Sequence, residues 1–153
     1  MPTLAETVKP EAIGQLLTAT LGRSVSVVRS RQTPGKGDLF GVYANSEKMQ
    51  KAGLLVSLSL AAHLAAALQI FPPARANQNI TSGRLEEEFV ENVQEILNIC
   101  SQVVTNATGE RMTLAEVCPW DKAPQRFKDA LRSAAAFEVT IQGYGKGLLS
   151  VVA

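Results

Sequence analysis

The sequence has few aromatic residues, little cysteine and histidine, and no excess of charge of either sign. Its 153 residues include two cysteines and one histidine, and aromatic residues make up 5%. Two cysteines are too few for a disulfide scaffold, and Cys100 and Cys118 lack the spacing of a zinc site. A formal net charge of +1 produces no field that would attract nucleic acid or an anionic membrane. We therefore expect no metal site, no nucleic-acid partner and no membrane partner.

Residues 1–12 contain no basic segment followed by an apolar stretch, so no secretory signal is visible. This pattern favours a cytoplasmic protein with reduced thiols. Hydrophobic residues make up 46% of the chain, which argues against a disordered protein. The length is typical of one domain with a buried core, and we assign residues 1–153 to a single domain.

The longest uncharged segment, residues 52–74, allows two interpretations. It is long enough to span a membrane. However, residues 54–60 end in an alternation of apolar residues and serines that is typical of a strand, and residues 61–71 are rich in the helix formers Ala and Leu. We favour a strand that leads into a buried helix. His63 lies in this helix, where we expect a partly buried ring with a local hydrogen bond.

Capping and turn residues indicate the other elements. Thr3 and Glu6 match a capping box, Pro10 suits the first turn of a helix, and Gly22 suits its end. Residues 112–117 are ambiguous between a strand and a helical turn. Alternation and composition predict strands at 24–30, 39–44, 137–141 and 148–152, turns at 31–38, 45–51 and 143–147, a surface loop at 74–83, and a short helix at 124–135.

These elements predict an α+β fold with one mixed, mostly antiparallel sheet of five or six strands and two long helices packed on it. The short turn near the C-terminus predicts a closing hairpin of adjacent antiparallel strands.

The longest helical pattern, residues 84–105, carries two stripes at helical spacing. The apolar stripe predicts a face that packs on the core; its members are Phe89, Val93, Ile96, Cys100 and Val103, widened by Leu97 and Val104. The polar stripe lies roughly opposite; its members are Glu91, Glu95, Asn98 and Gln102.

The polar stripe has a simple alternative interpretation as a solvated helix face. Two features favour a functional role for this stripe. Asn98 is a poor residue for a helix interior, and Glu91 and Glu95 are like charges four residues apart, which destabilises a helix unless a cation approaches.

The segment around residues 84–105 resembles a known protein family. The segment Glu95-Ile96-Leu97-Asn98, late in a long helix that follows a strand–helix unit, looks like the Glu-x-x-Asn motif of the CheC/CheX/FliY chemotaxis phosphatases, most like the CheX type. Residues 53–59 and the Ala-rich helix after them occupy the place of the family's central strand and helix. Pro119 and the closing hairpin are similarly placed, so that residues 10–153 follow the family's plan.

The resemblance implies a phosphatase that hydrolyses the phosphoaspartate of a CheY-like receiver domain in chemotaxis or two-component signalling. The catalytic residues would be Asn98, which orients the attacking water, and Glu95, which pairs with the receiver's active-site lysine. Magnesium would be held by the receiver, so this chain would need no cofactor of its own.

Two positions depart from the family's pattern and keep an alternative open. Glu91 stands where Asp or Ser is common, and Gln102 stands where Gly is frequent. Both residues flank the motif and are candidate partner-binding residues. The alternative is a non-catalytic adaptor of the same fold that binds a receiver, and a third hypothesis is a structural domain whose polar stripe is ordinary surface.

The resemblance also implies a homodimer, since CheX-type proteins pair. The apolar segment 148–152 is the candidate contact, as a strand at the edge of the sheet that a second copy could cover. Sequence patterns assign no role to Cys118 or Trp120.

Overall fold

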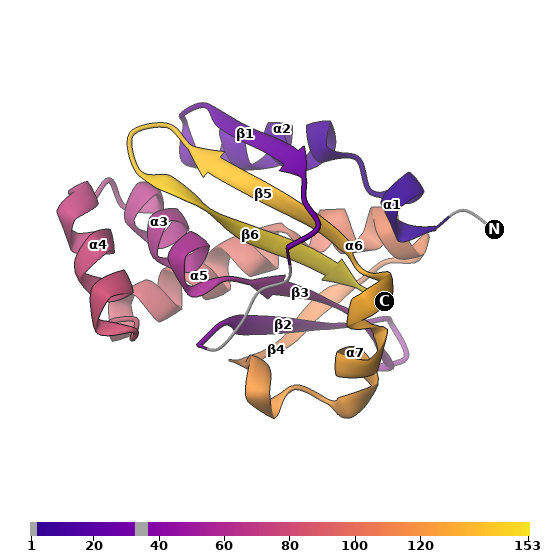
Figure 1. The fold of residues 1–153 in the computed structure, drawn as a ribbon. Coiled ribbons are helices and arrows are strands. Elements are labelled where there is room, and N and C mark those ends of the chain that lie inside the picture. The colour runs from indigo at the N-terminus through magenta and orange to yellow at the C-terminus, as the bar shows by residue number, and fades with distance from the viewer. Residues whose placement is uncertain (1–2, 33–36) are drawn as a thin grey trace.

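The computed structural model describes residues 3–32 and 37–153. This part of the chain forms seven α-helices and six strands, which are drawn in Figure 1. The helices are α1 (Leu4–Thr7), α2 (Pro10–Leu21), α3 (Leu58–Leu68), α4 (Pro73–Ser82), α5 (Glu87–Ile99), α6 (Ser101–Thr108) and α7 (Gln125–Ala130). The strands are β1 (Val25–Arg29), β2 (Leu39–Ala44), β3 (Gln50–Val56), β4 (Thr113–Pro119), β5 (Ala135–Ile141) and β6 (Gly145–Val152).

All six strands form one sheet in the order β1-β5-β6-β3-β2-β4. Every pairing between neighbours is antiparallel. The α+β prediction is therefore confirmed, and the sheet is antiparallel throughout rather than mixed.

The order of the strands shows that the fold consists of two halves of the same plan. Each half is a helix followed by three strands: α2 with β1, β2 and β3, and the pair α5–α6 with β4, β5 and β6. The first strand of each half pairs with the other half, so β1 lies beside β5 and β4 lies beside β2. The two halves meet at the centre, where β3 pairs with β6.

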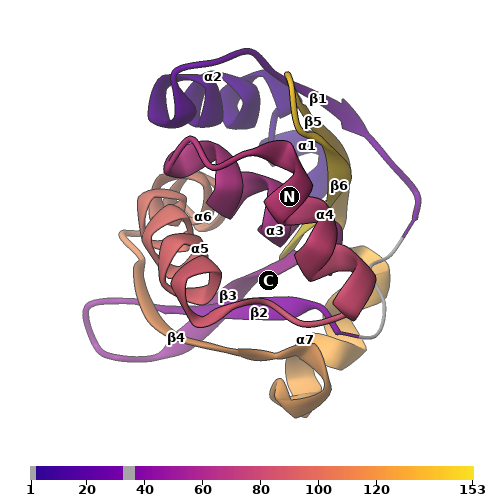
Figure 2. The ribbon, with the colours of Figure 1, turned by 90° about the vertical axis from the view of Figure 1, so that its left-hand side faces the viewer.

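The helices form a layer on one side of the sheet. Figure 2 shows α2, α3, α5 and α6 on this side and α7 on the other. The main core lies between the layer and the sheet and includes Tyr43, Leu60, Phe89 and Ile96. A smaller core under α7 contains Phe40 and Phe127.

The predicted capping residues at the N-terminal helices are confirmed. The Thr3 side chain accepts a hydrogen bond from the Glu6 N–H, and the Glu6 carboxylate accepts one from the Thr3 N–H. Pro10 is the first residue of α2, and Gly22 ends that helix with φ 69°. This left-handed conformation is one that glycine adopts without steric cost.

The boundary between β3 and α3 lies earlier than the alternation of 54–60 predicted. Ser57 is the N-cap of α3, and its Oγ accepts a hydrogen bond from the Leu60 N–H, so that Leu58 and Leu60 are helical. The helix therefore begins directly after Ser57, because its hydroxyl stabilises the first turn of α3. Among the described residues, no helix is long and apolar enough to cross a membrane.

The predicted surface loop at 74–83 is wrong, because this segment forms α4. Pro73 begins the helix and Gly83 ends it with φ 72°. Asn79 is buried and connects α4 to α5: its Oδ1 accepts from the Glu86 N–H, and its Nδ2 donates to the Glu86 carboxylate. A polar composition suggested a loop, but the polar side chains here make contacts between helices.

The strand formed by 148–152 is not at an edge of the sheet. It belongs to β6, which pairs with β5 on one side and β3 on the other. The edge strands are β1 and β4. The predicted contact for a second copy is therefore wrong, because the backbone groups of β6 are already used within the sheet.

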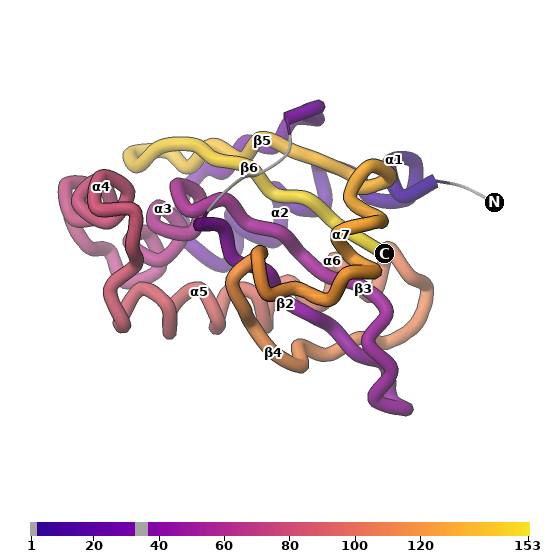
Figure 3. Tube along the Cα trace, turned by 60° about the horizontal axis from the view of Figure 1, so that its bottom comes forward, coloured from indigo at the N-terminus to yellow at the C-terminus, as the bar shows by residue number. Residues whose placement is uncertain are grey.

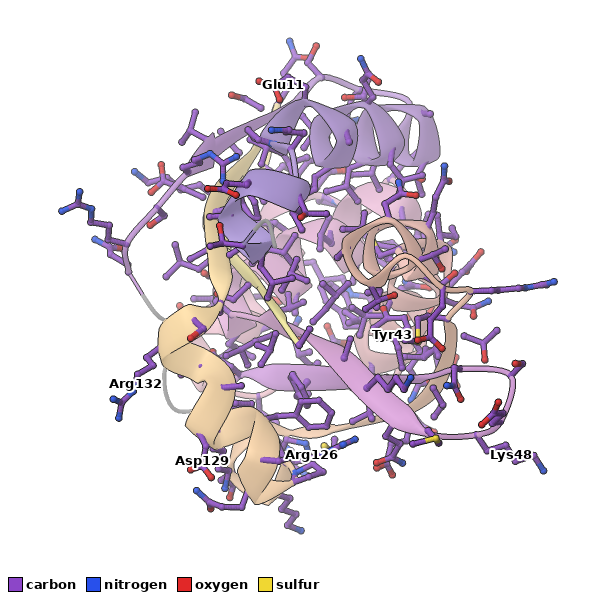
Figure 4. The ribbon with its side chains drawn as sticks, turned by 90° about the vertical axis from the view of Figure 1, so that its right-hand side faces the viewer. Glu11, Tyr43, Lys48, Arg126, Asp129 and Arg132 are labelled. Atoms are coloured by element: carbon purple, nitrogen blue, oxygen red, sulfur yellow. The ribbon has the colours of Figure 1, made fainter. Side chains whose placement is uncertain are left out.

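Several smaller boundaries also differ from the prediction. The ambiguous 112–117 contributes to strand β4, β3 begins at Gln50 inside the predicted turn 45–51, and β6 begins at Gly145 inside the predicted turn 143–147. The predicted turn 31–38 lies partly outside the described residues. The connection between β2 and β3, which carries Lys48, projects from the body of the molecule (Figures 3 and 4).

His63 is buried in α3, but its ring forms no hydrogen bond with the described residues, contrary to the expected local bond. An added Cβ at Gly145 would lie 2.5 Å from the ring's Nε2, so the ring packs directly on the start of β6. Burial lowers the pKa of His63 below its ordinary value of 6.5.

Because the folded pKa is lowered, the protein should lose stability on mild acidification. Unfolded His63 binds a proton below about pH 6.5, whereas the folded protein excludes it. This contribution is fully present above the unfolded pKa and is lost as the pH falls through the window below it. Urea unfolding between pH 8 and pH 5 measures the effect. A His63→Gln variant should have a flatter profile, and an equally steep profile would contradict the assignment to His63.

Candidate functional site

The residues of the polar stripe lie on the outer face of α5 and the start of α6. Glu91, Glu95, Asn98 and Gln102 are all exposed, and within the described part of the chain none of these side chains forms a hydrogen bond or ion pair. Figure 3 shows α5 along the outside of the molecule. The four side chains are therefore accessible to a partner.

The apolar stripe of the same helix holds it on the core. Its members are almost completely buried: Phe89, Val93, Ile96, Leu97, Cys100, Val103 and Val104. Asn92 is also buried, and its amide Nδ2 donates to the Ala65 carbonyl of α3 at 3.4 Å. Both stripes lie as the spacing predicted, and the packing against α3 keeps the exposed face of α5 in a defined orientation.

The N-terminal end of α5 is acidic and only partly neutralised. Arg75 of α4 forms ion pairs with Glu86 at 3.2 Å and Glu88 at 2.6 Å. The hydrogen bond from Arg75 lowers the pKa of Glu86. Glu87 and Glu91 have no such partner among the described residues. The face that leads to Glu95 therefore carries unpaired negative charge.

The predicted single helix 84–105 is divided into α5 and α6, and the division lies directly after the motif. α5 ends at Ile99, α6 begins at Ser101, and Cys100 between them has φ −69° and ψ −1°. The hydroxyl of Tyr43 donates a hydrogen bond to the main-chain carbonyl of Leu97 at this point. Tyr43 is fully buried between the sheet and the helices (Figure 4).

Gln102, beyond the division, lines a hollow between α2 and α6. The hollow has a volume of about 300 Å³ and is lined by Ala12, Gln15, Leu16, Gln102, Val103 and Asn106. Three of these side chains carry carboxamides, which both donate and accept hydrogen bonds. Asn98 does not line the hollow.

Tyr43, Gln15 and Asn106 could not be assigned to this site from the sequence. Tyr43 lies in an apolar strand, where an aromatic residue indicates only burial. Gln15 and Asn106 come from helices that are far apart in the sequence. Only the tertiary fold brings these residues to the end of the motif helix.

The two cysteines and Trp120 pack in or against the two hydrophobic cores. Cys100 is buried in the main core, and burial raises the pKa of its thiol to about 12. Cys118 and Trp120 pack on the smaller core, where the Trp120 ring meets Phe40 edge to face at 5.1 Å. In residues 3–32 and 37–153, no group of three or more His, Cys, Asp or Glu side chains is placed to hold a metal ion.

Comparison with known proteins identifies the fold. No family model matches the sequence, and no curated protein matches it significantly. Several solved structures are similar, including the following three. The FliM middle domain from H. pylori has a TM-score of 0.65 at 10% identity, with 94% of this chain and 83% of that chain covered. FliM in the FliG–FliM complex from H. pylori has a TM-score of 0.65 at 10% identity, with 95% and 86% covered. Thermotoga maritima FliY has a TM-score of 0.53 at 14% identity, with 94% and 88% covered.

At these identities the similarity concerns the fold. It extends over nearly the whole chain. The assignment to the CheX type in particular stays a prediction. The chain has the fold of FliY and of the FliM middle domain, which is the fold that the resemblance to the CheC/CheX/FliY family implied.

Proposed function

We propose that this protein binds the phosphorylated receiver domain of a CheY-like response regulator and hydrolyses its phosphoaspartate. The proposal rests on the exposure of Glu95 and Asn98 on one face of α5. They lie three residues apart on one helix, so they project from the same face, and both are exposed without partners among the described residues.

Each side chain has a distinct role in this proposal. The Asn98 amide both donates and accepts hydrogen bonds, so it can hold a water in line with the acyl phosphate. The Glu95 carboxylate pairs with the receiver's active-site lysine. Glu91, one turn before Glu95, extends the negative surface that meets this cation. Magnesium belongs to the receiver, and no step requires a metal on this chain.

The second candidate function is that of an adaptor which binds a receiver without hydrolysing its phosphate. The similarity to FliM from a complex with FliG supports it, since a FliM domain of this fold binds a protein partner. In this case the same outer face of α5 makes the contact.

A homodimer remains part of the proposal, with a different contact from the one predicted. The free edges of the sheet are β1 and β4, and an exposed edge strand is a template for pairing with a second copy. Sedimentation velocity on the full chain measures whether the pair forms.

Phosphate release from a panel of phosphorylated receivers tests the proposed function. We expect acceleration over spontaneous hydrolysis on at least one receiver. Glu95→Ala should raise the KM for that receiver roughly tenfold and also slow turnover, because the lost charge pair contributes to both encounter and lifetime. Glu47→Ala removes an exposed carboxylate from the connection between β2 and β3 and is the matched control. Binding without acceleration by the wild type would select the adaptor.

A further inference from the structure

A buried tyrosine hydroxyl meets the helix that carries the motif at the point where this helix is interrupted. In a continuous α-helix, the carbonyl of Leu97 would accept a hydrogen bond from the N–H of Ser101, four residues later. Here it accepts one from the hydroxyl of Tyr43, which reaches it from β2. Burial, and to a smaller extent the neighbouring Cys100, raises the pKa of Tyr43 above its ordinary value, so the hydroxyl keeps the proton that it donates.

The backbone hydrogen bonds on either side agree with an interruption at this point. Within the described chain, the helical ladder of α5 ends with the bond from the Cys100 N–H to the Ile96 carbonyl at 2.9 Å, and α6 begins only at Ser101. The N–H groups of Val103 and Val104 both turn to the Cys100 carbonyl, at 2.9 and 3.4 Å. A side chain that inserts into the helical ladder is a known cause of such a break.

The division of the helix also concerns the position of Gln102 relative to Asn98. In an unbroken helix, the residue four positions after Asn98 would lie on the same face, one turn further along. The side chain at that position is Gln102, and in the structure it lines the hollow beside α2, together with Gln15 and Asn106. Asn98 does not line this hollow.

We propose that Tyr43 is a positioning residue for the face that carries Asn98: its hydroxyl breaks the helix after the motif and directs Gln102 toward α2, which keeps the space beside Asn98 open for a receiver's phosphoaspartate. The effect of Tyr43 on a receiver rests on the proposed function. The effect of its hydroxyl on the helix does not, and the two are measured separately.

The first measurement is hydrogen exchange on the free protein. Tyr43→Phe keeps the ring and removes the donor, so the Leu97 carbonyl becomes available to the N–H of Ser101. Exchange of the Ser101 amide should slow by about tenfold or more. Tyr144→Phe is a matched control, because the Tyr144 hydroxyl also donates to a main-chain carbonyl, that of Phe71, at 2.7 Å. Exchange at Ser101 should not respond to this control.

The second measurement is kcat/KM for phosphate release, in a double-mutant cycle with Gln102→Ala. Tyr43→Phe should lower kcat/KM about tenfold when Gln102 is present, because its side chain then moves next to Asn98. In the Gln102→Ala background, Tyr43→Phe should change kcat/KM less than about twofold. A purely structural role would produce the same loss in both backgrounds, and that result would overturn the proposal.

The outcomes separate the two ideas. Unchanged exchange at Ser101 in Tyr43→Phe would overturn the role of the hydroxyl, whatever the protein does to receivers. Slowed exchange, together with a wild type that neither binds nor dephosphorylates any receiver, would overturn the proposed function and the positioning role, while the hydroxyl would stand as the cause of the break.

Discussion

Replacing Asn98 by alanine is expected to reduce the hydrolysis of a receiver's phosphoaspartate by about 100-fold or more, because the reaction depends on the position of the attacking water. The fold should be unaffected. Asn98 is exposed and unpartnered in the described chain, and alanine is the better helix former, so the free energy of unfolding should stay within about 0.5 kcal/mol of the wild type. Phosphate release and urea unfolding measure the two quantities.

Leu97→Ala is the control for this prediction, because it changes the neighbouring residue but is expected to affect the stability of the fold. Leu97 is 2% exposed, and its loss should destabilise the fold by about 2–5 kcal/mol. Equal phosphate release by the wild type and Asn98→Ala, on a receiver that the wild type accelerates, would remove Asn98 from the mechanism.

A large effect on stability is also expected for Gly147→Ala in β6. A Cβ at this position would lie 2.5 Å from both the backbone N and the Cβ of Leu60, and 2.7 Å from Oγ of Ser57. The same Ser57 hydroxyl caps α3 and accepts a hydrogen bond from the Leu148 N–H at 2.9 Å. Since backbone atoms cannot move aside as a flexible side chain does, the variant should lose about 3 kcal/mol of stability.

Gly14→Ala is the matched control for Gly147→Ala. Gly14 is also buried, but the closest atom to an added Cβ is the Val25 carbonyl oxygen at 3.4 Å, which is an ordinary contact. Because alanine is favoured over glycine inside a helix, this variant should be neutral or more stable by up to about 1 kcal/mol. Similar urea midpoints for the two variants would contradict the close approach of α3 to β6.

The face of the candidate site could be predicted from the sequence because helix periodicity is a local property. Apolar residues at a spacing of three and four must share one side of a helix, and the polar residues between them must share the other. The stripes of α5 lie as this rule requires, so Glu95 and Asn98 were predicted on an exposed face and are found on one. The conformation just after Asn98 could not be predicted in this way, because it depends on a hydroxyl 54 residues away.

The errors in the fold have a common cause. Segment 148–152 was correctly predicted as a strand. Its place in the sheet depends on long-range pairing with β3, which local composition does not predict. The helix α4 has a polar sequence typical of a loop, but Asn79 and Arg75 bond to glutamates at the start of α5. In both cases the partner, rather than the segment itself, decides the structure.

The sequence by itself determined the α+β class, the caps of the first helices and the two faces of the motif helix, since each depends on residues within one or two turns of each other. Only the tertiary structure decided the order of the strands, the division of the motif helix at Cys100 and the hollow between α2 and α6. These features depend on contacts between residues far apart in the chain. Such contacts form only when burial of the core brings the two halves together, and their energies leave no periodic pattern in the sequence.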